Sequence, residues 1–168
     1  MSDAGHAANA FVEHIRNQVV GHPVSYRRLA LNSLLIYVDC QPGDPTGVIF
    51  WFEPTWHLRG PDRVLTGSRQ AQPDEDAKEP DAGFRAAGLA LDALWDRTVE
   101  AVEVEPVTHS LIVRFEGGYE VRTFVSDPTS DLDWHIDENA TGHSVEGHSG
   151  GVKLVRRGDR EANTDAPA

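Results

Sequence analysis

The chain has 168 residues, and its 27 Asp and Glu against 15 Lys and Arg give a formal net charge of -12 at pH 7. The length fits one domain, and a hydrophobic content of 39% is enough to build a core. Nucleic acids and anionic membranes are themselves polyanions, so a negative field of this size disfavours both as partners. The composition instead favours a basic protein partner.

The negative charge is unevenly distributed along the chain. Residues 1–72 hold six acids and six Arg and are neutral, so residues 73–168 carry the whole excess. Within that part, residues 99–137 contain nine acids against Arg114 and Arg122. We therefore expect any acidic recognition surface to lie in the second half of the chain.

The sequence predicts a soluble, cytoplasmic protein. Its one cysteine, Cys40, cannot form an internal disulfide, which suits a reducing compartment. The N-terminal stretch lacks the basic and apolar regions of a secretory signal. The longest apolar runs, 34–38 and 48–52, are far shorter than the roughly 20 residues of a membrane helix.

The first half of the chain predicts one helix followed by strands. Phe11, Ile15 and Val19 recur at helical spacing, and Gly21 and Pro23 end the helix. The runs 34–38 and 48–52 are apolar on both faces, which predicts central strands covered on both sides.

The second half begins with an acidic, proline-containing segment, 73–83, which we expect to be a flexible linker. A helix is expected over about 84–95, with Leu89, Leu91, Leu94 and Trp95 as buried candidates. Alternation over 111–115 predicts a strand with one solvent-facing side, and Gly117-Gly118 predicts a two-residue hairpin turn.

An internal repeat relates the two halves. Residues 24–58 contain NSLLIYV, a turn, VIFWFE and TWHL, and residues 99–136 contain HSLIVRF, a turn, YEVRTFV and DWHI in the same order. Ser33 precedes Trp56 by 23 positions, and Ser110 precedes Trp134 by 24. The repeat predicts an α+β fold of two antiparallel β-meander units, each preceded by a short helix, that form one sheet or a split barrel. Chance similarity between strands of like composition is the alternative.

These patterns predict a single domain over 1–157, made of repeats at about 8–72 and 84–157, with a disordered tail at 158–168. The NSLLIYV…TWHL and HSLIVRF…DWHI blocks resemble small uncharacterised bacterial proteins classed as domains of unknown function, and this resemblance implies no activity. In size, acidity and lack of catalytic motifs the chain is also similar to bacterial immunity proteins, which neutralise basic toxins by binding.

A histidine follows each repeat tryptophan, and the two could form a metal or general-base site. His135 shares one strand face with Asp133 and Asp137, and carboxylate and imidazole groups can together hold a divalent cation. If a pseudo-twofold axis relates the units, Glu53 and His57 would face Asp133 and His135. The alternative is that these are polar residues on a solvated strand face.

Other candidate sites carry weaker patterns. Residues 147–151 match G-x-S-x-G formally but lack the strand-turn-helix context of a nucleophile elbow, so we interpret them as a Gly/Ser/His-rich loop. His143 and His148 could bind a metal only in a rigid frame. Cys40 beside Asp39 is expected to be unreactive. Trp51 and Tyr37 could form the walls of a small-molecule site between the units.

The leading hypothesis is a non-enzymatic binding or regulatory module that needs no cofactor and contacts a basic protein partner. The metal-dependent enzyme and the small-molecule binder are its alternatives, and the sequence leaves the oligomeric state open. The contact residues are expected on solvent-exposed strand faces or turns of the second repeat: Glu103, Glu105, Glu120, Asp131, Asp133 and Asp137.

Overall fold

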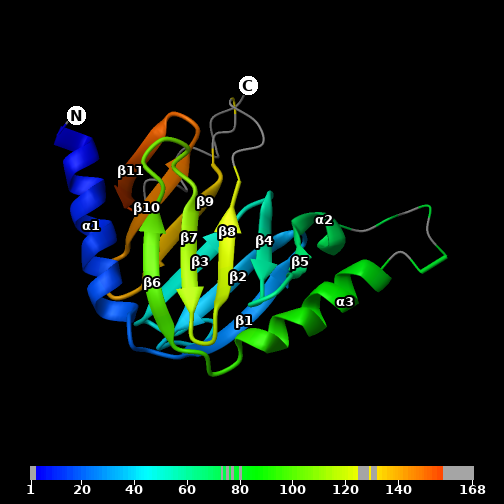
Figure 1. The fold of residues 1–168 in the computed structure, drawn as a ribbon. Coiled ribbons are helices and arrows are strands. Elements are labelled where there is room, and N and C mark those ends of the chain that lie inside the picture. Colours follow the sequence, from blue (N-terminus) through cyan, green and yellow to red (C-terminus); the bar gives the residue numbers. More distant parts are fainter. Residues whose placement is uncertain are drawn as a thin grey trace.

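The computed structural model describes residues 3–72, 74, 76, 78–79, 81–124, 129 and 132–156. It is an α+β protein with two antiparallel sheets and few helices (Figure 1). One sheet has six strands in the order β1-β2-β3-β9-β10-β11, and the other has five in the order β5-β4-β8-β7-β6. Of the two arrangements that the sequence left open, one sheet or a split barrel, the single sheet is not confirmed.

The first half of the chain contributes two helices and five strands. The N-terminal helix ends at Val19, and the turn after it contains Gly21 at a φ of 88°, as its predicted helix-ending role requires. Every residue of the second strand is buried, which confirms its predicted central position. The elements are α1 (Asp3–Val19), β1 (Val24–Ala30), β2 (Ser33–Val38), β3 (Val48–Phe52), β4 (Trp56–Arg59), β5 (Val64–Gly67) and α2 (Ser68–Ala71).

The second half contains α3, a 3-10 turn and six strands. The predicted linker lies partly outside the described residues, and α3 already begins within its last positions. The predicted tail lies wholly outside them. The elements are α3 (Ala82–Ala90), the 3-10 turn (Leu91–Leu94), β6 (Val99–Val104), β7 (Leu111–Phe115), β8 (Tyr119–Thr123), β9 (Trp134–Glu138), β10 (His143–His148) and β11 (Gly151–Arg156).

Two local expectations for the second half need correction. Phe115 pairs with Tyr119, so the β7–β8 turn spans three residues, although Gly117 and Gly118 do adopt positive φ angles of 79° and 78°. The expected Gly/Ser/His-rich loop is instead the hairpin of β10 and β11. Its strands form because β10 pairs along its length with β9 and is buried in the sheet.

The two halves of the chain exchange strands between the sheets. After β3 the chain crosses to the other sheet, where β4 pairs with β8, and after β8 it crosses back, where β9 pairs with β3. A short antiparallel bridge between Pro23 and Thr98 joins the sheets at one corner. In the described part of the chain β1, β11, β5 and β6 remain edge strands, so the sheets do not close into a barrel.

The main core lies between the two sheets, and the helices close its sides. Inward-facing side chains such as Phe50, Phe115 and Trp134 are fully buried there. Helix α1 covers the side between β11 and β6, with Ile15 in the core, and α3 with the 3-10 turn covers the side between β5 and β1 (Figure 1). Because this packing buries the inner faces of both sheets, any binding site must lie on their outer faces or at their edges.

The two repeat tryptophans make the same contact in their respective halves. The Trp56 indole donates to the carbonyl of Asn32 at 2.7 Å, and the Trp134 indole donates to that of His109, also at 2.7 Å. Each acceptor directly precedes a serine of the repeat. The match fits the repeat, although a duplicated unit stays a prediction.

The second predicted helix is only partly correct. Leu91 and Leu94 are buried as expected, but Leu89 is 70% exposed and Trp95 is 51% exposed. The chain changes from α to 3-10 geometry at Leu91, so one amphipathic stripe does not continue through the segment. Trp95 lies outside the core, with the Arg27 guanidinium 4.6 Å from its ring centre.

Candidate functional site

Polar and charged side chains of β4, β7 and β8 point to the outer face of the five-stranded sheet. On β4, Trp56 and Leu58 point into the core, so His57 and Arg59 point outward. The strand register places Arg59 opposite Glu120 on β8, and Glu120 opposite Arg114 on β7. The neighbouring row runs from His57 through Arg122 to Ile112.

Three arginines surround the Glu120 carboxylate on this face. Arg114 Nε lies 3.1 Å from Glu120 Oε2, Arg122 Nε lies 3.3 Å from Oε1, and Arg59 Nη2 lies 3.7 Å from Oε2. We call Arg59, Arg114 and Arg122 the arginine face.

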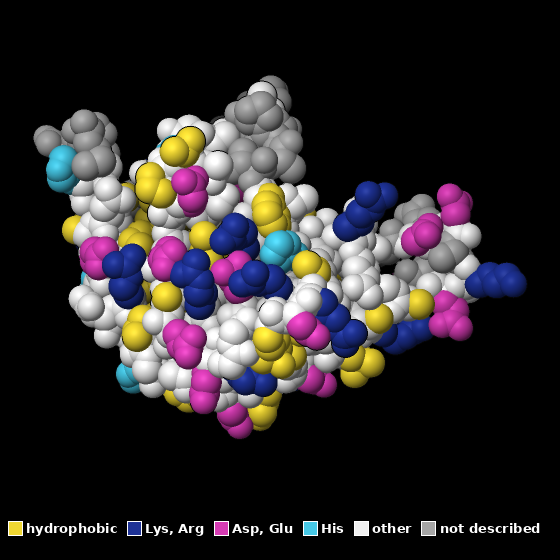
Figure 2. All heavy atoms as spheres, in the orientation of Figure 1, with side chains coloured by type: hydrophobic (Ala, Val, Ile, Leu, Met, Phe, Trp, Pro, Cys, Tyr) yellow, Lys and Arg dark blue, Asp and Glu magenta, His cyan; other side chains and the backbone are white. Residues whose placement is uncertain are grey.

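The arginine face presents positive charge to solvent. The side chains of Arg59, Arg114 and Arg122 are 51%, 38% and 37% exposed, whereas that of Glu120 is 5% exposed. A second acid, Glu103, pairs with Arg114 and raises the pKa of its guanidinium, chiefly through a side-chain hydrogen bond. Three cations against two acids leave a local charge of +1. Figure 2 shows Lys and Arg side chains gathered over the middle of this face.

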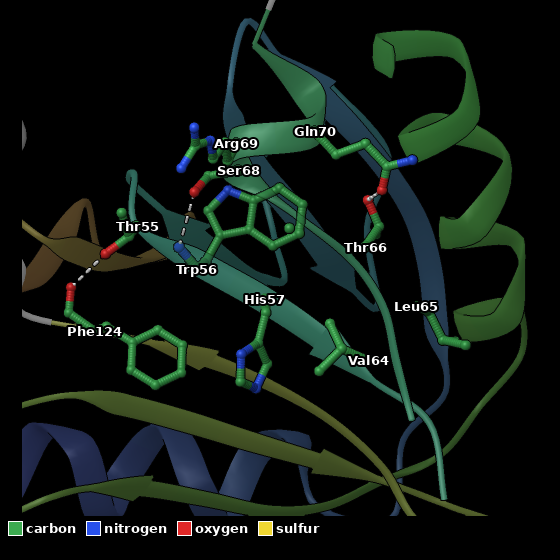
Figure 3. Close-up of a pocket in the computed structure, with 11 residues that line it drawn as sticks. Thr55, Trp56, His57, Val64, Leu65, Thr66, Ser68, Arg69, Gln70 and Phe124 are labelled. Carbon is green, nitrogen blue, oxygen red and sulfur yellow. Dashed lines mark hydrogen bonds between the residues drawn. The ribbon is translucent and has the colours of Figure 1, made fainter. Parts of the chain in front are cut away.

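A hollow of about 590 Å³ adjoins the arginine face, bounded by β4, β5, α2 and Phe124 (Figure 3). The register places Gly67 of β5 opposite His57, so no side chain fills the sheet surface there. A Cβ at Gly67 would lie 2.8 Å from the Trp56 carbonyl oxygen, which is too close for any larger residue. The close approach of β4 and β5 therefore requires this glycine and leaves the space beside His57 open.

His57 lines the hollow, and its ring centre is 4.7 Å from that of Phe124. Burial lowers the pKa of the imidazole, as do the nearby Arg122 and Arg59, while Glu120 opposes them. A histidine whose pKa lies below its usual 6.5 is mainly neutral at pH 7. The site thus combines guanidinium donors, a neutral imidazole and an aromatic ring, which is suited to holding an anionic group beside an apolar one.

The predicted contact acids of β6 and β8 do not form an exposed acidic face. Glu120 is 4% exposed and enclosed by arginines, and Glu103 is paired with Arg114. Glu105 accepts hydrogen bonds from the backbone N–H groups of Val107 and Thr108 in its own turn, and the bond from Thr108 is the main cause that lowers its pKa. The predicted solvent exposure is wrong for Glu120, because the sheet register encloses it among arginines, whereas the Glu103 side chain is 47% exposed and Glu105 lies in a turn as expected.

The remaining predicted contact acids lie beside β9 or outside the described residues. Asp133 and Asp137 are 4% and 7% exposed, so their predicted solvent exposure is also wrong. Ser144 on the neighbouring β10 donates to the Asp137 carboxylate, and the Asp133 backbone hydrogen-bonds to Gly147 of the same strand. The carboxylate of Asp137 is thus enclosed by β10, the strand that the sequence did not predict. Asp131 lies outside the described residues.

The predicted metal-binding set is not assembled. His57 lies on the outer face of the five-stranded sheet, whereas His135 lies on the outer face of the six-stranded sheet, opposite the core. Glu53 accepts a hydrogen bond from Ser33 Oγ at 2.6 Å. Among the residues that the structure describes, no group of three or more His, Cys, Asp or Glu could hold a metal ion.

Tyr37 and Trp51, the predicted walls of a small-molecule site, lie on the outer face of the six-stranded sheet rather than between the two units. Tyr37 packs edge-on against Tyr26, and Trp51 stacks on His135 with ring centres 5.1 Å apart, both on the outer face of the six-stranded sheet. Cys40 is buried beside them. Burial, assisted by Asp44, raises the pKa of its thiol to about 11, in the direction expected for an unreactive cysteine.

The G-x-S-x-G segment belongs to the β10–β11 hairpin and not to a strand-turn-helix motif. Gly147 lies on β10 against the Trp134 indole, and the serine lies in the turn. His143 and His148 are the two ends of β10. This spacing separates the two histidines by the length of the strand.

Sequence reasoning missed the arginine face and Phe124. Alternation on β7 and β8 indicated that Arg114 and Arg122 face outward, but Arg59 reaches Glu120 only because β4 crosses to the sheet of the other half. A pairing between strands about 60 residues apart leaves no local signal in one sequence. The sequence signal for a charged surface was limited to the outward-facing charged residues on each separate strand.

Comparisons with known proteins give no assignment for this architecture. No protein-family model, curated protein or solved structure matches the chain. Within the described residues, none of the helices combines the length and apolar character needed to span a bilayer. The proposals below therefore rest on the site itself.

Proposed function

We propose that this chain is a non-enzymatic binding module whose contact surface is the arginine face, and that its partner presents carboxylates there. The observation that supports this is the clustering of three partly exposed guanidinium groups around one carboxylate that is itself hidden from solvent. In a molecule with a net charge of -12, a local excess of positive charge on one sheet face distinguishes that face from the rest.

The guanidinium groups have donors left for an incoming acid. Arg59 approaches Glu120 only to 3.7 Å, which is longer than a hydrogen bond. The Nε of Arg122 is buried 3.3 Å from Glu120, but the side chain as a whole is 37% exposed, so the accessible part of its guanidinium lies elsewhere. A guanidinium carries five N–H donors in a plane and binds carboxylates through two at once. A partner carboxylate between Arg59 and Arg122 would use these groups.

The local charge favours a short acidic peptide segment over a nucleic acid. Nucleic-acid binding requires several Lys or Arg to neutralise successive phosphates, and its affinity falls steeply with salt for that reason. The arginine face offers a local charge of +1 in a molecule whose overall field repels a long polyanion. A few carboxylates match this capacity better.

The hypothesis of a basic partner rests on the overall acidity of the chain. Its proposed contacts include Glu120, Asp133 and Asp137, each less than a tenth exposed. Buried carboxylates give a partner little surface to contact. We therefore favour an acidic partner, and the sign of the partner's charge becomes the first quantity to measure.

Fluorescence anisotropy with two labelled peptides, one of eight glutamates and one of eight lysines, tests this sign at low salt. We expect the glutamate peptide to bind and its affinity to fall as salt rises, because screening weakens contacts between exposed charges. Replacing Arg59→Gln or Arg122→Gln should weaken binding about three- to tenfold, which matches the net contribution of about 0.5–1.5 kcal/mol from one partly solvent-exposed hydrogen bond.

The control variant is Arg85→Gln, which removes an exposed, ion-paired arginine from α3. It should leave binding unchanged. Arg59→Gln is the safer of the two test variants, since this side chain is half exposed and its contact to Glu120 is long. Binding of the lysine peptide alone, or equal losses in all three variants, would overturn the proposal.

A further inference from the structure

We infer that the hollow beside His57 is a subsite for an aromatic side chain of the same acidic segment, so that the partner is an acidic peptide containing an aromatic residue. This inference rests on the proposed function and adds a second contact to it. The hollow and the arginine face are adjacent, because His57 and Arg122 are directly opposite each other on β4 and β8. Such neighbours have Cβ atoms about 5 Å apart.

The polar groups that line the hollow already bond to one another. Thr66 Oγ1 donates to Gln70 Oε1 at 3.0 Å, and Thr55 Oγ1 donates to the Phe124 carbonyl at 2.8 Å (Figure 3). The backbone N–H of Trp56 donates to Ser68 Oγ at 3.3 Å. With these groups engaged, the hollow favours a guest that needs few hydrogen bonds.

Apolar surfaces remain for that guest to contact. Phe124 is 40% exposed and borders the hollow on one side, and Val64, 56% exposed, borders it on β5. The imidazole of His57 lies between them in Figure 3. Its lowered pKa keeps the ring neutral at pH 7, so an apolar guest does not have to desolvate a charge.

The size of the hollow and its charged border set the class of ligand. A volume of about 590 Å³ lies within the range of roughly 300–1,000 Å³ typical of ligand pockets and accepts an aromatic ring. Arg69 of α2 also borders the hollow, and Arg122 lies beyond His57. Positive charge on both sides of an apolar space complements an aromatic residue flanked by acids.

The experiment compares a peptide of eight glutamates carrying one central phenylalanine with the matched peptide carrying glycine at that position. We expect the phenylalanine peptide to bind about fivefold more tightly, as partial burial of one aromatic ring in a shallow site would give. The Phe124→Ala variant should abolish this difference and leave the affinity for the glycine peptide unchanged. Val64→Asn, on the opposite border, should reduce the difference as well.

Leu89→Ser serves as the control because it removes an exposed apolar side chain of α3 outside the hollow. It should preserve the fivefold preference. If both peptides bind equally and both weaken in Arg59→Gln, the aromatic subsite is wrong and the arginine-face proposal stands. If neither peptide binds, both proposals are wrong. A preference that persists in Phe124→Ala and Val64→Asn would place the aromatic contact elsewhere and overturn the subsite.

Discussion

At the scale of single residues, burial determines the chemistry of His57. Its position on a strand indicated only that it faces away from Trp56 and Leu58. The structure adds that Phe124 packs against its ring and that Arg122 and Arg59 lie nearby. These surroundings disfavour the imidazolium, which makes His57 a binding surface at neutral pH rather than a cation.

The lowered pKa of His57 predicts how stability depends on pH. The folded pKa lies below the ordinary value of 6.5, so the unfolded chain binds the proton more readily. The contribution of neutral His57 to stability is therefore complete above pH 6.5 and is lost as pH falls through the folded pKa. Chemical denaturation between pH 7.5 and 5 should show the wild-type protein losing more stability than the His57→Gln variant.

An NMR titration of the imidazole protons checks the same prediction directly. The resonance that disappears in His57→Gln identifies the residue, and its midpoint should lie below 6.5. A midpoint at or above 6.5, or a stability difference between the two proteins that does not change with pH, would contradict the assignment of a buried neutral ring.

At the scale of elements, β10 shows how tertiary packing can override a weak local pattern. Its sequence, with histidines, serine and glycine, has little strand propensity. It forms a strand because β9 and β11 pair with it on both sides and because Gly147 leaves room for the Trp134 indole. The glycine that suggested a loop is thus required by a close contact in the core.

The contact between Gly147 and Trp134 predicts a large loss of stability in Gly147→Ala. The added Cβ would lie 2.0 Å from Trp134 Cε2, and the indole is fully buried. Overpacking of this kind costs about 1–3 kcal/mol, and more where the neighbours cannot shift. Urea denaturation followed by tryptophan fluorescence measures the change.

Gly88→Ala in α3 provides the matched control for this substitution. A Cβ at Gly88 meets nothing within 4 Å, and this helical position should gain about 0.5–1 kcal/mol from the replacement. If Gly147→Ala were as stable as the wild-type protein, the close packing of β10 against Trp134 would be incorrect.

At the scale of the whole molecule, the exchange of strands makes the two halves of the chain interdependent. Strand β4 completes its pairing only on β8 of the second half, and β9 completes the six-stranded sheet only on β3 of the first half. Each half alone would leave unpaired strand edges and an open core. The same exchange creates the arginine face, since Arg59 comes from the first half of the chain and Arg114 and Arg122 come from the second.

This interdependence predicts that the protein unfolds in one cooperative step and that neither half folds alone. Polypeptides of residues 1–72 and 82–156 should each lack a cooperative thermal transition in circular dichroism, because each lacks the strands that complete its sheets. Mixing the two should restore β-sheet signal. Independent folding of either polypeptide would show that the exchanged strands are dispensable.

The sequence by itself determined the features that depend on neighbouring residues. Helical spacing through Ile15 and Val19, full burial of β2 and the positive φ angles of Gly117 and Gly118 follow from local patterns and agree with the structure. The α+β class followed from the same patterns. These properties are set by interactions over a few residues, which one sequence records.

Only the tertiary structure decided which surfaces exist. Net charge indicated an acidic contact surface, yet the register between distant strands enclosed Glu120 among arginines and buried Asp133 and Asp137. The hollow beside His57 likewise depends on Gly67 lying opposite it in the sheet. Charge and exposure at a site depend on which strands pair, and pairing between strands far apart in the chain is determined by the packing of the whole molecule.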